Sequence, residues 1–225
     1  MVKVVLACTS ASELKGYPTG LWIEECATPY YLFQEKGYEV VLASPAGGAI
    51  PIDASSMAEG FFTDAAKKFL HDVTAMGAFS HSVKLSSIDW TTVDAIYLTG
   101  GHGTCADFVT DPNLKNGVEI LYAAKNVVAA ACHGPVGLAQ CVKSDGTPLV
   151  AGKTVTGFAD SEEEAVQLTG IVPFLLEKRF KELGAKYEKG PDWTSKVCVD
   201  GNLVTGQNPQ SSEACAQAVI TLLGA

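Results

Sequence analysis

Basic residues are scarce in this sequence, and their scarcity limits its partners. Lysine and arginine together number 16, against 25 aspartates and glutamates, so the formal net charge at pH 7 is −9. Nucleic acids and anionic membrane surfaces attract proteins with an excess of positive charge, which this chain lacks. We therefore predict that its partners include no nucleic acid and no membrane.

Long apolar runs are also missing. Nowhere do about 18 consecutive apolar residues occur, the length that a membrane-spanning helix needs. The apolar stretch near the start of the sequence, which follows Lys3, is too short for the core of a signal peptide with its cleavage site. It is better explained as a first buried strand.

Cysteine is present, but in no known pairing motif. The seven cysteines stand at positions 8, 26, 105, 132, 141, 198 and 215, with no C-x-x-C pair and no metal-ligand spacing. An odd set without such motifs is typical of a reducing compartment. We expect free thiols, no metal site and a cytoplasmic protein.

Histidine occurs only four times and never after His133. A glutaminase-type site, whose histidine comes from the C-terminal part of the chain, therefore cannot be built from this sequence. His71 and His81 have no carboxylate or cysteine at metal-ligand spacing, so we interpret them as structural positions.

The length of 225 residues suits one α/β domain with a sizeable core. Buried strand segments alternate with helical segments, and this order predicts parallel strands joined by right-handed crossovers. Residues 49–89 break the alternation and are predicted to form an insertion or cap within the single domain 1–225. Pro29 is expected to break or kink the first helix, and residues 17–20 to form a turn. Strands are expected at about 2–8, 38–44, 93–99 and 126–131, a hairpin at 197–205, and helices at 21–36, 61–72, 114–124, 173–183 and 211–223.

The strand at 126–131 ends abruptly at Cys132, which His133 follows. The small residues two positions before and after the cysteine, Ala130 and Gly134, are typical of a tight strand-to-helix turn that exposes the side chain at its apex. The macrodipole at a helix N-terminus favours a thiolate, so we predict that Cys132 is a nucleophile with a lowered pKa. The alternative is a small buried hydrophobic residue, as free cysteines often are.

Gly100, Gly101, His102 and Gly103 form a glycine-rich loop after the preceding strand. The loop lacks the lysine of a phosphate-binding loop and does not match G-x-G-x-x-G, so its N–H groups are better suited to hold an oxyanion. Because parallel strands open at the same sheet edge, this loop and Cys132 are expected to share one crevice. His102 is either a polar wall of that crevice or an ordinary loop residue.

Two groups of acidic residues open predicted helices. Glu24 and Glu25 lie near the start of the first helix, where each is either an ordinary first-turn acid or a buried carboxyl that faces Cys132. The acidic run at 160–164 opens a later helix, and an acidic first turn is common there too.

Five short segments form a combination that points to one family. They are Thr19-Gly20-x-x-x-x-Glu25, Gly100-Gly101-His102-Gly103, Ala131-Cys132-His133-Gly134-Pro135, Gly157-Phe158-x-Asp160 and Val204-Thr205-Gly206-Gln207-Asn208-Pro209. This combination resembles the DJ-1/PfpI superfamily and, within it, the Hsp31-type glyoxalase III branch, over nearly the whole chain. The resemblance implies a flavodoxin-like three-layer sandwich with a mostly parallel central sheet and a homodimer. It also implies a lyase without cofactors that converts methylglyoxal, a small 2-oxoaldehyde, to D-lactate.

The resemblance also assigns roles to individual residues. Cys132 matches the nucleophile, His133 the histidine beside it, and Glu25 the carboxyl that contacts the sulfur. Glu24 falls one position short of that match. The acidic residue that completes a Cys-His-Glu triad is best matched by Glu163, with Glu162 and Glu164 as alternatives.

These roles predict a mechanism. The Cys132 thiolate adds to the aldehyde, Glu25 and His133 move a proton between the two carbons, and hydrolysis of the resulting thioester releases the hydroxy acid. Cys105 and Cys26 depart from the family's usual apolar residues and leave open a resolving thiol for Cys132. The residues expected to hold the oxyanion or the substrate are Gly100, Gly101, His102, Gly103 and Gly134.

Two other classes of function are open at this point. A cysteine peptidase or amidase would use the same thiol, although a small crevice under the 49–89 cap does not suit a peptide. A stress-response chaperone or redox-sensing protein of the same superfamily would need only exposed apolar surface or a sensitive thiol.

Overall fold

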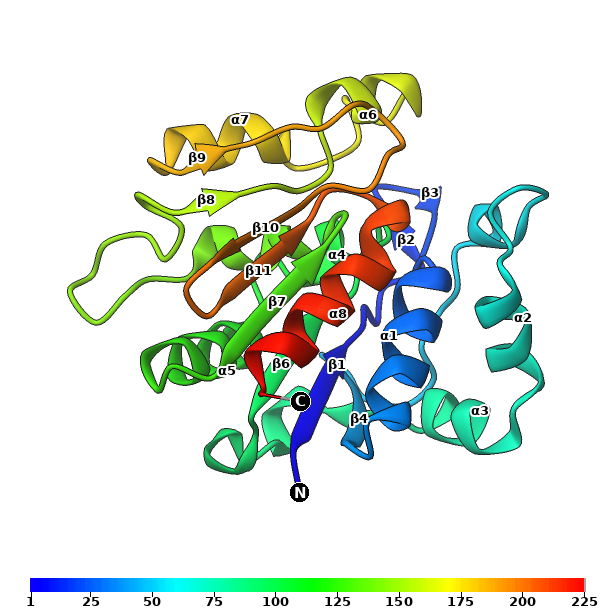
Figure 1. The fold of residues 1–225 in the computed structure, drawn as a ribbon. Coiled ribbons are helices and arrows are strands. Elements are labelled where there is room, and N and C mark those ends of the chain that lie inside the picture. The colour runs from blue at the N-terminus through cyan, green and yellow to red at the C-terminus, as the bar shows by residue number, and fades with distance from the viewer. Residues whose placement is uncertain (225) are drawn as a thin grey trace.

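A seven-stranded sheet forms the middle layer of the molecule. The computed structural model describes residues 1–224, and within them the strands lie in the order β10-β11-β7-β6-β1-β4-β5 (Figure 1). Neighbouring strands are parallel except for β10 and β11, which form the predicted antiparallel hairpin. The mostly parallel sheet is therefore confirmed. The strands span Lys3–Ala7 (β1), Glu39–Ser44 (β4), Val83–Lys84 (β5), Ala95–Leu98 (β6), Val127–Ala131 (β7), Val197–Asp200 (β10) and Leu203–Gly206 (β11).

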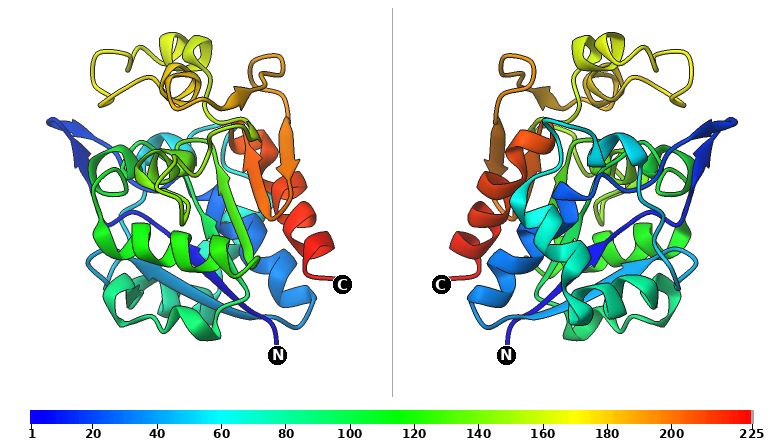
Figure 2. Two further views of the ribbon diagram at one scale, coloured as in Figure 1. Left: turned by 90° about the vertical axis from the view of Figure 1, so that its left-hand side faces the viewer. Right: turned by 90° about the vertical axis from the view of Figure 1, so that its right-hand side faces the viewer.

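Helices cover both faces of this sheet and complete a three-layer sandwich (Figure 2). On one face α1 packs against α8 and α2, and α3 joins them; on the other face lie α5 and the 3₁₀ helix Gly134–Gln140, against which α7 packs. The helices span Glu24–Glu35 (α1), Asp64–His71 (α2), Val73–Ser80 (α3), Thr104–Asp107 (α4), Pro112–Ala123 (α5), Asp160–Ala165 (α6), Leu176–Glu182 (α7) and Ser212–Leu222 (α8).

The sheet is buried on both faces because its strands are apolar at nearly every position. In β1, Val4 and Leu6 pack into one hydrophobic cluster, whereas Val5 and Ala7 pack into the other. Alternate side chains of a strand point to opposite faces, so a continuous apolar run is what a strand between two helical layers requires. The same rule explains why β7 is fully buried up to Cys132.

Pro29 lies inside α1, and the helix continues through it to Glu35. Of the two expected outcomes, a break is therefore wrong, and a kink stays a prediction. A proline in a helix interior costs about 3 kcal/mol through its missing N–H and its ring. Burial of Cys26, Tyr30 and Phe33 on the same helix offsets that cost, since packing rather than propensity supplies most helical stability.

Residues 17–20 do not form a turn, which corrects a second expectation. Tyr17–Pro18 (β3) pairs instead with Glu13–Leu14 (β2) in a small hairpin. The turn lies at Lys15 and Gly16, which both have positive φ, 51° and 81°. A two-residue turn of that kind matches the twist of the strands it joins.

The segment 49–89 contributes α2, α3 and β5, and β5 extends the sheet beside β4. Phe69 and Phe79 are buried in the cluster that also contains α1. Most of this segment is thus packed into the domain. A bridge between Leu21 and Ile52 holds the chain just before the 3₁₀ helix Ala54–Met57 (η1) near the carboxyl edge of the sheet. That it acts as a cap stays a prediction.

The carboxyl ends of β1, β6, β7 and β11 open at one edge of the sheet. The chain between β8 (Thr154–Val155) and β9 (Lys186–Tyr187), which contains α6 and α7, lies over that edge in both views of Figure 2. Within residues 1–224, no helix has the length and apolar character needed to cross a bilayer. The shared edge is where the predicted site residues meet.

Candidate active site

Cys132 stands at a sharp bend directly after β7. Its φ is +54°, in the left-handed region that side chains other than glycine rarely adopt. A Cβ at Gly134 would lie 2.2 Å from the carbonyl oxygen of Leu98, and one at Gly100 would lie 2.8 Å from the Cβ of Cys132, so both positions admit only glycine. The predicted tight turn is confirmed, although the helix that follows is of the 3₁₀ type.

The bend brings the neighbouring imidazole to the sulfur. Nδ1 of His133 lies 3.4 Å from Sγ of Cys132. Nε2 of the same ring lies 2.7 Å from Oε2 of Glu163, on α6. The thiol, the imidazole and the carboxyl thus form one continuous line of contacts.

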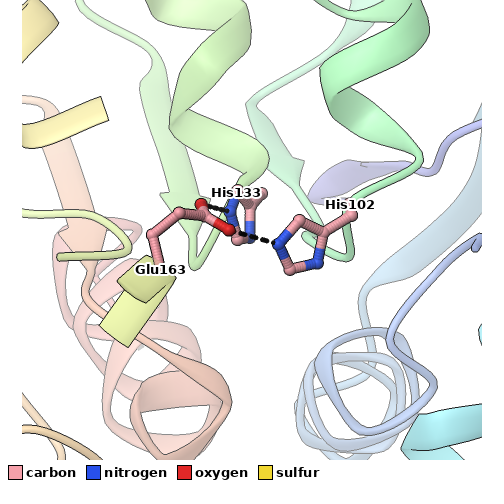
Figure 3. A group of neighbouring side chains, drawn as sticks. All are labelled: His102, His133 and Glu163. Carbon is pink, nitrogen blue, oxygen red and sulfur yellow. Dashed lines mark hydrogen bonds and ion pairs between the residues drawn. The ribbon is translucent and has the colours of Figure 1, made fainter. Parts of the chain in front are cut away.

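Glu163 contacts a second histidine as well. Its other oxygen, Oε1, lies 2.8 Å from Nε2 of His102, in the glycine-rich loop (Figure 3). The rings of His102 and His133 lie 3.9 Å apart between centroids, at 42°. His102 is therefore a polar wall of the site, which decides between the two expectations for this residue.

These contacts fix the charge of the group. Burial raises the pKa of Glu163, but the imidazole of His133 and the hydrogen bonds from both rings outweigh it, and the net pKa is lowered. Burial, followed by the charge of His102, lowers the pKa of His133. An ionised Glu163 accepts an Nε2–H bond from each ring, which leaves the Nδ1 lone pairs to act as bases.

Glu162 and Glu164, the sequence neighbours of Glu163, do not contact the histidines. Glu162 is buried, and its carboxylate accepts hydrogen bonds from the N–H of Ala159 at 3.0 Å and of Trp193 at 2.9 Å. Glu164 is exposed. Of the three acidic residues considered from the sequence, only Glu163 reaches the imidazoles.

Glu25 lies behind the thiol, on the first turn of α1. It is fully buried, and its Oε2 accepts a hydrogen bond from the N–H of Gly100 at 2.9 Å. Burial raises the pKa of Glu25 to about 8, against the lowering effects of its hydrogen bonds with Cys132 and Gly100. At neutral pH the carboxyl thus carries a proton that it can donate to the sulfur.

Glu24, the near match in the sequence, faces away. Its carboxylate accepts hydrogen bonds from the hydroxyl of Thr28 at 2.6 Å and from that of Thr63. The structure therefore brings Glu25, and not Glu24, to Cys132.

The expectation of a lowered thiol pKa was wrong in its simple form. Burial raises the pKa of Cys132, and an ionised Glu25 raises it further, while the N–H of Gly101 lowers it. The helix-dipole reasoning ignored desolvation, which dominates at a sulfur that is 3% exposed. A thiolate is favoured only while Glu25 holds the proton, so the two groups titrate as a pair.

The glycine-rich loop supplies fewer free N–H groups than expected. The N–H of Gly100 donates to Glu25, and that of Gly103 donates to the carbonyl oxygen of Gly20 at 3.3 Å. The N–H of Gly101 points at the sulfur. Gly101 has φ +97°, and a Cβ there would lie 2.3 Å from the same Gly20 oxygen, so the loop needs glycine for close approach.

A cavity of about 490 Å³ opens above the sulfur. Cys132, Gly101 and His102 contribute to its lining, whereas Glu25 and His133 do not. Among the described residues, no lysine or arginine lines it. Its walls are mostly apolar and come from distant segments, including Trp22, Phe61, Phe158, Leu168 and Trp193.

The comparisons with known proteins agree with this architecture. The model of the DJ-1/PfpI family matches residues 22–222. This chain belongs to the DJ-1/PfpI family. It shares the flavodoxin-like fold of that family, as the sequence resemblance implied.

Curated relatives of this DJ-1/PfpI protein are glyoxalases. The chain is 33% identical to Glyoxalase 3 of Candida albicans and 32% identical to a glutathione-independent glyoxalase of Saccharomyces cerevisiae, covering 98% of each chain in both cases. The solved structure of the Candida glyoxalase III superposes with a TM-score of 0.91 at 32% identity, covering 98% of this chain and 97% of that one. Rapid Encystment Protein 24 KDa of Francisella tularensis gives 0.95 at 36% identity, covering both chains fully.

No contact between Cys132 and either candidate resolving thiol, Cys26 or Cys105, occurs within residues 1–224 of this DJ-1/PfpI protein. Sγ of Cys26 lies 4.0 Å from Sγ of Cys8, and both side chains are fully buried. Cys105 is also buried, and burial raises its pKa. Neither Cys26 nor Cys105 lines the cavity in the described part of the chain, and a resolving role for either stays a hypothesis.

His102, His133 and Glu163 are also the group that could hold a metal ion, with ligand atoms within 4.8 Å of one another. The cysteine and histidine spacings could not reveal this group, because each residue comes from a different segment. A metal ion would have to replace both imidazole hydrogen bonds of Glu163.

A second hollow, of about 650 Å³, lies between α5 and residues 142–153. It is near the start of β7, whereas Cys132 follows the end of that strand. It is more open than the cavity at the thiol, and none of the candidate catalytic residues line it. The smaller cavity is therefore the candidate active site.

Proposed function

We propose that this protein is a glutathione-independent glyoxalase that converts methylglyoxal to D-lactate through a hemithioacetal on Cys132. The curated relatives support the activity. The observation that carries it is the placement of one thiol in the lining of a mostly apolar cavity, between the Nδ1 of His133 and the buried carboxyl of Glu25.

The first step is formation of the carbon–sulfur bond. Nδ1 of His133 accepts the thiol proton, and the ionised Glu163 stabilises the imidazolium through Nε2. The sulfur adds to the aldehyde carbon, and the N–H of Gly101 lies beside the sulfur to stabilise the oxyanion that forms. Glu25, protonated at neutral pH, offsets the negative charge on sulfur before the bond forms.

The second step is an internal redox exchange between adjacent carbons. A proton moves from the aldehyde carbon to the ketone carbon, so the first is oxidised to a thioester while the second is reduced to an alcohol. Water then releases lactate and restores the thiol. Because the net reaction adds one water to methylglyoxal, no electron acceptor is consumed, which supports a lyase that needs no cofactor.

We extend the proposal to the setting of the enzyme. The free thiols favour a cytoplasmic protein, and the family resemblance favours a homodimer, with residues 1–225 as one domain and 49–89 as its cap. Asp53, Ser55 and Phe61, which line the cavity, support the cap.

The test is a replacement of the sulfur. Cys132→Ser is expected to abolish lactate formation from methylglyoxal without glutathione, measured with stereospecific D- and L-lactate assays. Cys198→Ser, on the edge strand β10, is the matched control and should retain full activity. Turnover that persists in Cys132→Ser, or lactate of the L form, would contradict the proposal.

A chaperone-like role is the second candidate, because apolar side chains surround the mouth of the cavity. Tyr17, Phe61, Val166 and Trp193 line it and are 38%, 42%, 38% and 40% exposed. Suppression of the aggregation of a client protein, undiminished in Cys132→Ser, would support this role beside the enzymatic one. A cavity of about 490 Å³ is small for a peptide, so a fluorogenic peptide screen is expected to be negative.

A further inference from the structure

The proposed chemistry requires a base that touches the carbons of the substrate, and the structure limits which group that is. His133 is 1% exposed, and its two ring nitrogens face Sγ of Cys132 and Oε2 of Glu163. Glu25 lies behind the sulfur, held by the N–H of Gly100. Neither residue lines the cavity in the described part of the chain. Both therefore serve the sulfur rather than the carbons.

His102 is placed differently. It lines the cavity together with Cys132, and its Nε2 donates to Oε1 of Glu163 at 2.8 Å. Its other nitrogen, Nδ1, lies on the side of the ring away from Glu163 (Figure 3) and has no hydrogen-bond partner within residues 1–224. The bond to an ionised carboxylate keeps the proton on Nε2, so Nδ1 presents a lone pair.

We propose that His102 is the acid–base group that carries the proton from one substrate carbon to the other, while His133 serves the thiol. This inference rests on the proposed glyoxalase function. It divides between two histidines the work that the sequence assigned to His133 and Glu25.

The step balances without any other reagent. Nδ1 of His102 takes the hydrogen on the sulfur-bearing carbon as a proton. The electron pair of that bond forms a double bond to the ketone carbon, and the carbonyl electron pair moves onto the ketone oxygen, which gives an enediolate. The resulting imidazolium returns the proton to the former ketone carbon, and the pair of the double bond forms the new carbon–hydrogen bond. The hydroxyl proton passes from the first oxygen to the second, which leaves a thioester and a neutral His102.

Glu163 couples the two histidines. One carboxylate stabilises a positive charge on either ring, but the rings are only 3.9 Å apart between centroids, so a charge on one opposes a charge on the other. His133 must therefore release the thiol proton to the adduct before His102 accepts the carbon-bound one. The order of the two proton transfers follows from this shared carboxylate.

His102→Gln tests the proposal, because a glutamine amide can still donate to Glu163 but cannot accept a proton. The expected loss in kcat with methylglyoxal is about 10²–10⁴-fold, the usual contribution of general acid–base catalysis, with KM little changed. Alkylation of Cys132 by iodoacetamide should stay within about 2-fold of wild type, whereas His133→Gln should slow it. His71→Ala, an exposed histidine on α2, is the matched control for both assays.

Chemical rescue gives an independent readout. His102→Ala should regain kcat in proportion to added imidazole, since the cavity of about 490 Å³ has room for the free base beside a three-carbon substrate. A kcat in His102→Gln close to wild type, or parallel losses of kcat and alkylation, would overturn the role of His102 and leave the glyoxalase proposal standing. An inactive wild-type protein would overturn both.

Discussion

The two carboxyls of the candidate site, Glu25 beside the thiol and Glu163 beside the imidazoles, are both buried, yet their pKa values are shifted in opposite directions. Glu25 accepts a hydrogen bond from one backbone N–H, that of Gly100, and burial raises its pKa to about 8. Glu163 has two imidazoles as partners, and they lower its pKa in spite of burial. Burial alone therefore does not decide the charge of an acid, because the groups that face it can reverse the outcome.

This difference divides the labour of the site. A neutral carboxyl behind the sulfur can donate a hydrogen bond to a thiolate, whereas an ionised carboxylate beside the histidines can stabilise imidazolium. Pairs of acids whose environments push their pKa values apart are a recurrent way to obtain acid and base chemistry at one pH.

The largest effect is expected from removing the charge at Glu163. Glu163→Gln presents an amide NH₂ to one of two Nε2–H donors, so one imidazole must turn or change tautomer. By comparison with triads in which the acid becomes an amide, kcat should fall by about 10³–10⁴-fold. Steady-state lactate formation measures this. A loss below tenfold would mean that the carboxylate only fills space.

The pH dependence of stability should separate the two carboxyls by sign. The pKa of Glu25 is raised in the folded state from 4.5 to about 8, so its contribution is complete below pH 4.5 and is lost as pH rises to about 8. The pKa of Glu163 is lowered, so its contribution is present above about pH 4.5 and is lost as pH falls.

Urea denaturation at pH 4.5, 6 and 8.5 can read these slopes. Glu25→Gln should remove a decline on the order of a few kcal/mol between pH 4.5 and 8, whereas Glu163→Gln should leave that decline intact. Identical pH slopes for wild type and Glu25→Gln would show that Glu25 is ionised in the folded protein at neutral pH.

The smallest effect concerns the reactivity of the thiol. Glu25→Leu removes the donor to sulfur and should slow alkylation of Cys132 at pH 6 by about 10-fold, equivalent to one pKa unit. Glu25→Gln keeps an N–H donor and should retain part of the rate, while Glu24→Gln, whose partners are Thr28 and Thr63, is the control. An unchanged rate in Glu25→Leu would mean that this carboxyl does not act on the sulfur.

Much of the site could be predicted because its backbone requirements are local. The small residues Ala130 and Gly134 predict the bend at Cys132. The parallel crossovers predict that the loop at Gly100 lies at the same edge of the sheet as this bend. The choice of Glu163 over Glu162 and Glu164 came only from the family resemblance. Which of the three faces the histidines depends on the rotation of the six-residue helix α6, and contacts such as that of Glu162 with Trp193 set this rotation.

Other features had no local signal. The cavity walls come from segments as distant as Trp22 and Trp193, and the pairing of His102 with Glu163 joins residues 61 positions apart. The raised pKa of Cys132 was missed since a helix terminus can be read from a sequence, whereas desolvation depends on everything packed around the thiol. The continuation of α1 past Pro29 had no local signal for the same reason, because tertiary packing overrode the local preference of proline.

The left-handed backbone at Cys132 also bears on how this position can evolve. A residue with a side chain held at φ +54° costs about 1–2 kcal/mol that glycine would not. A Cys132→Gly substitution would therefore give a more stable protein without the reactive thiol. We therefore expect that selection for the reactivity of the thiol keeps a cysteine at this position, and that the folded protein is less stable than it would be with glycine there.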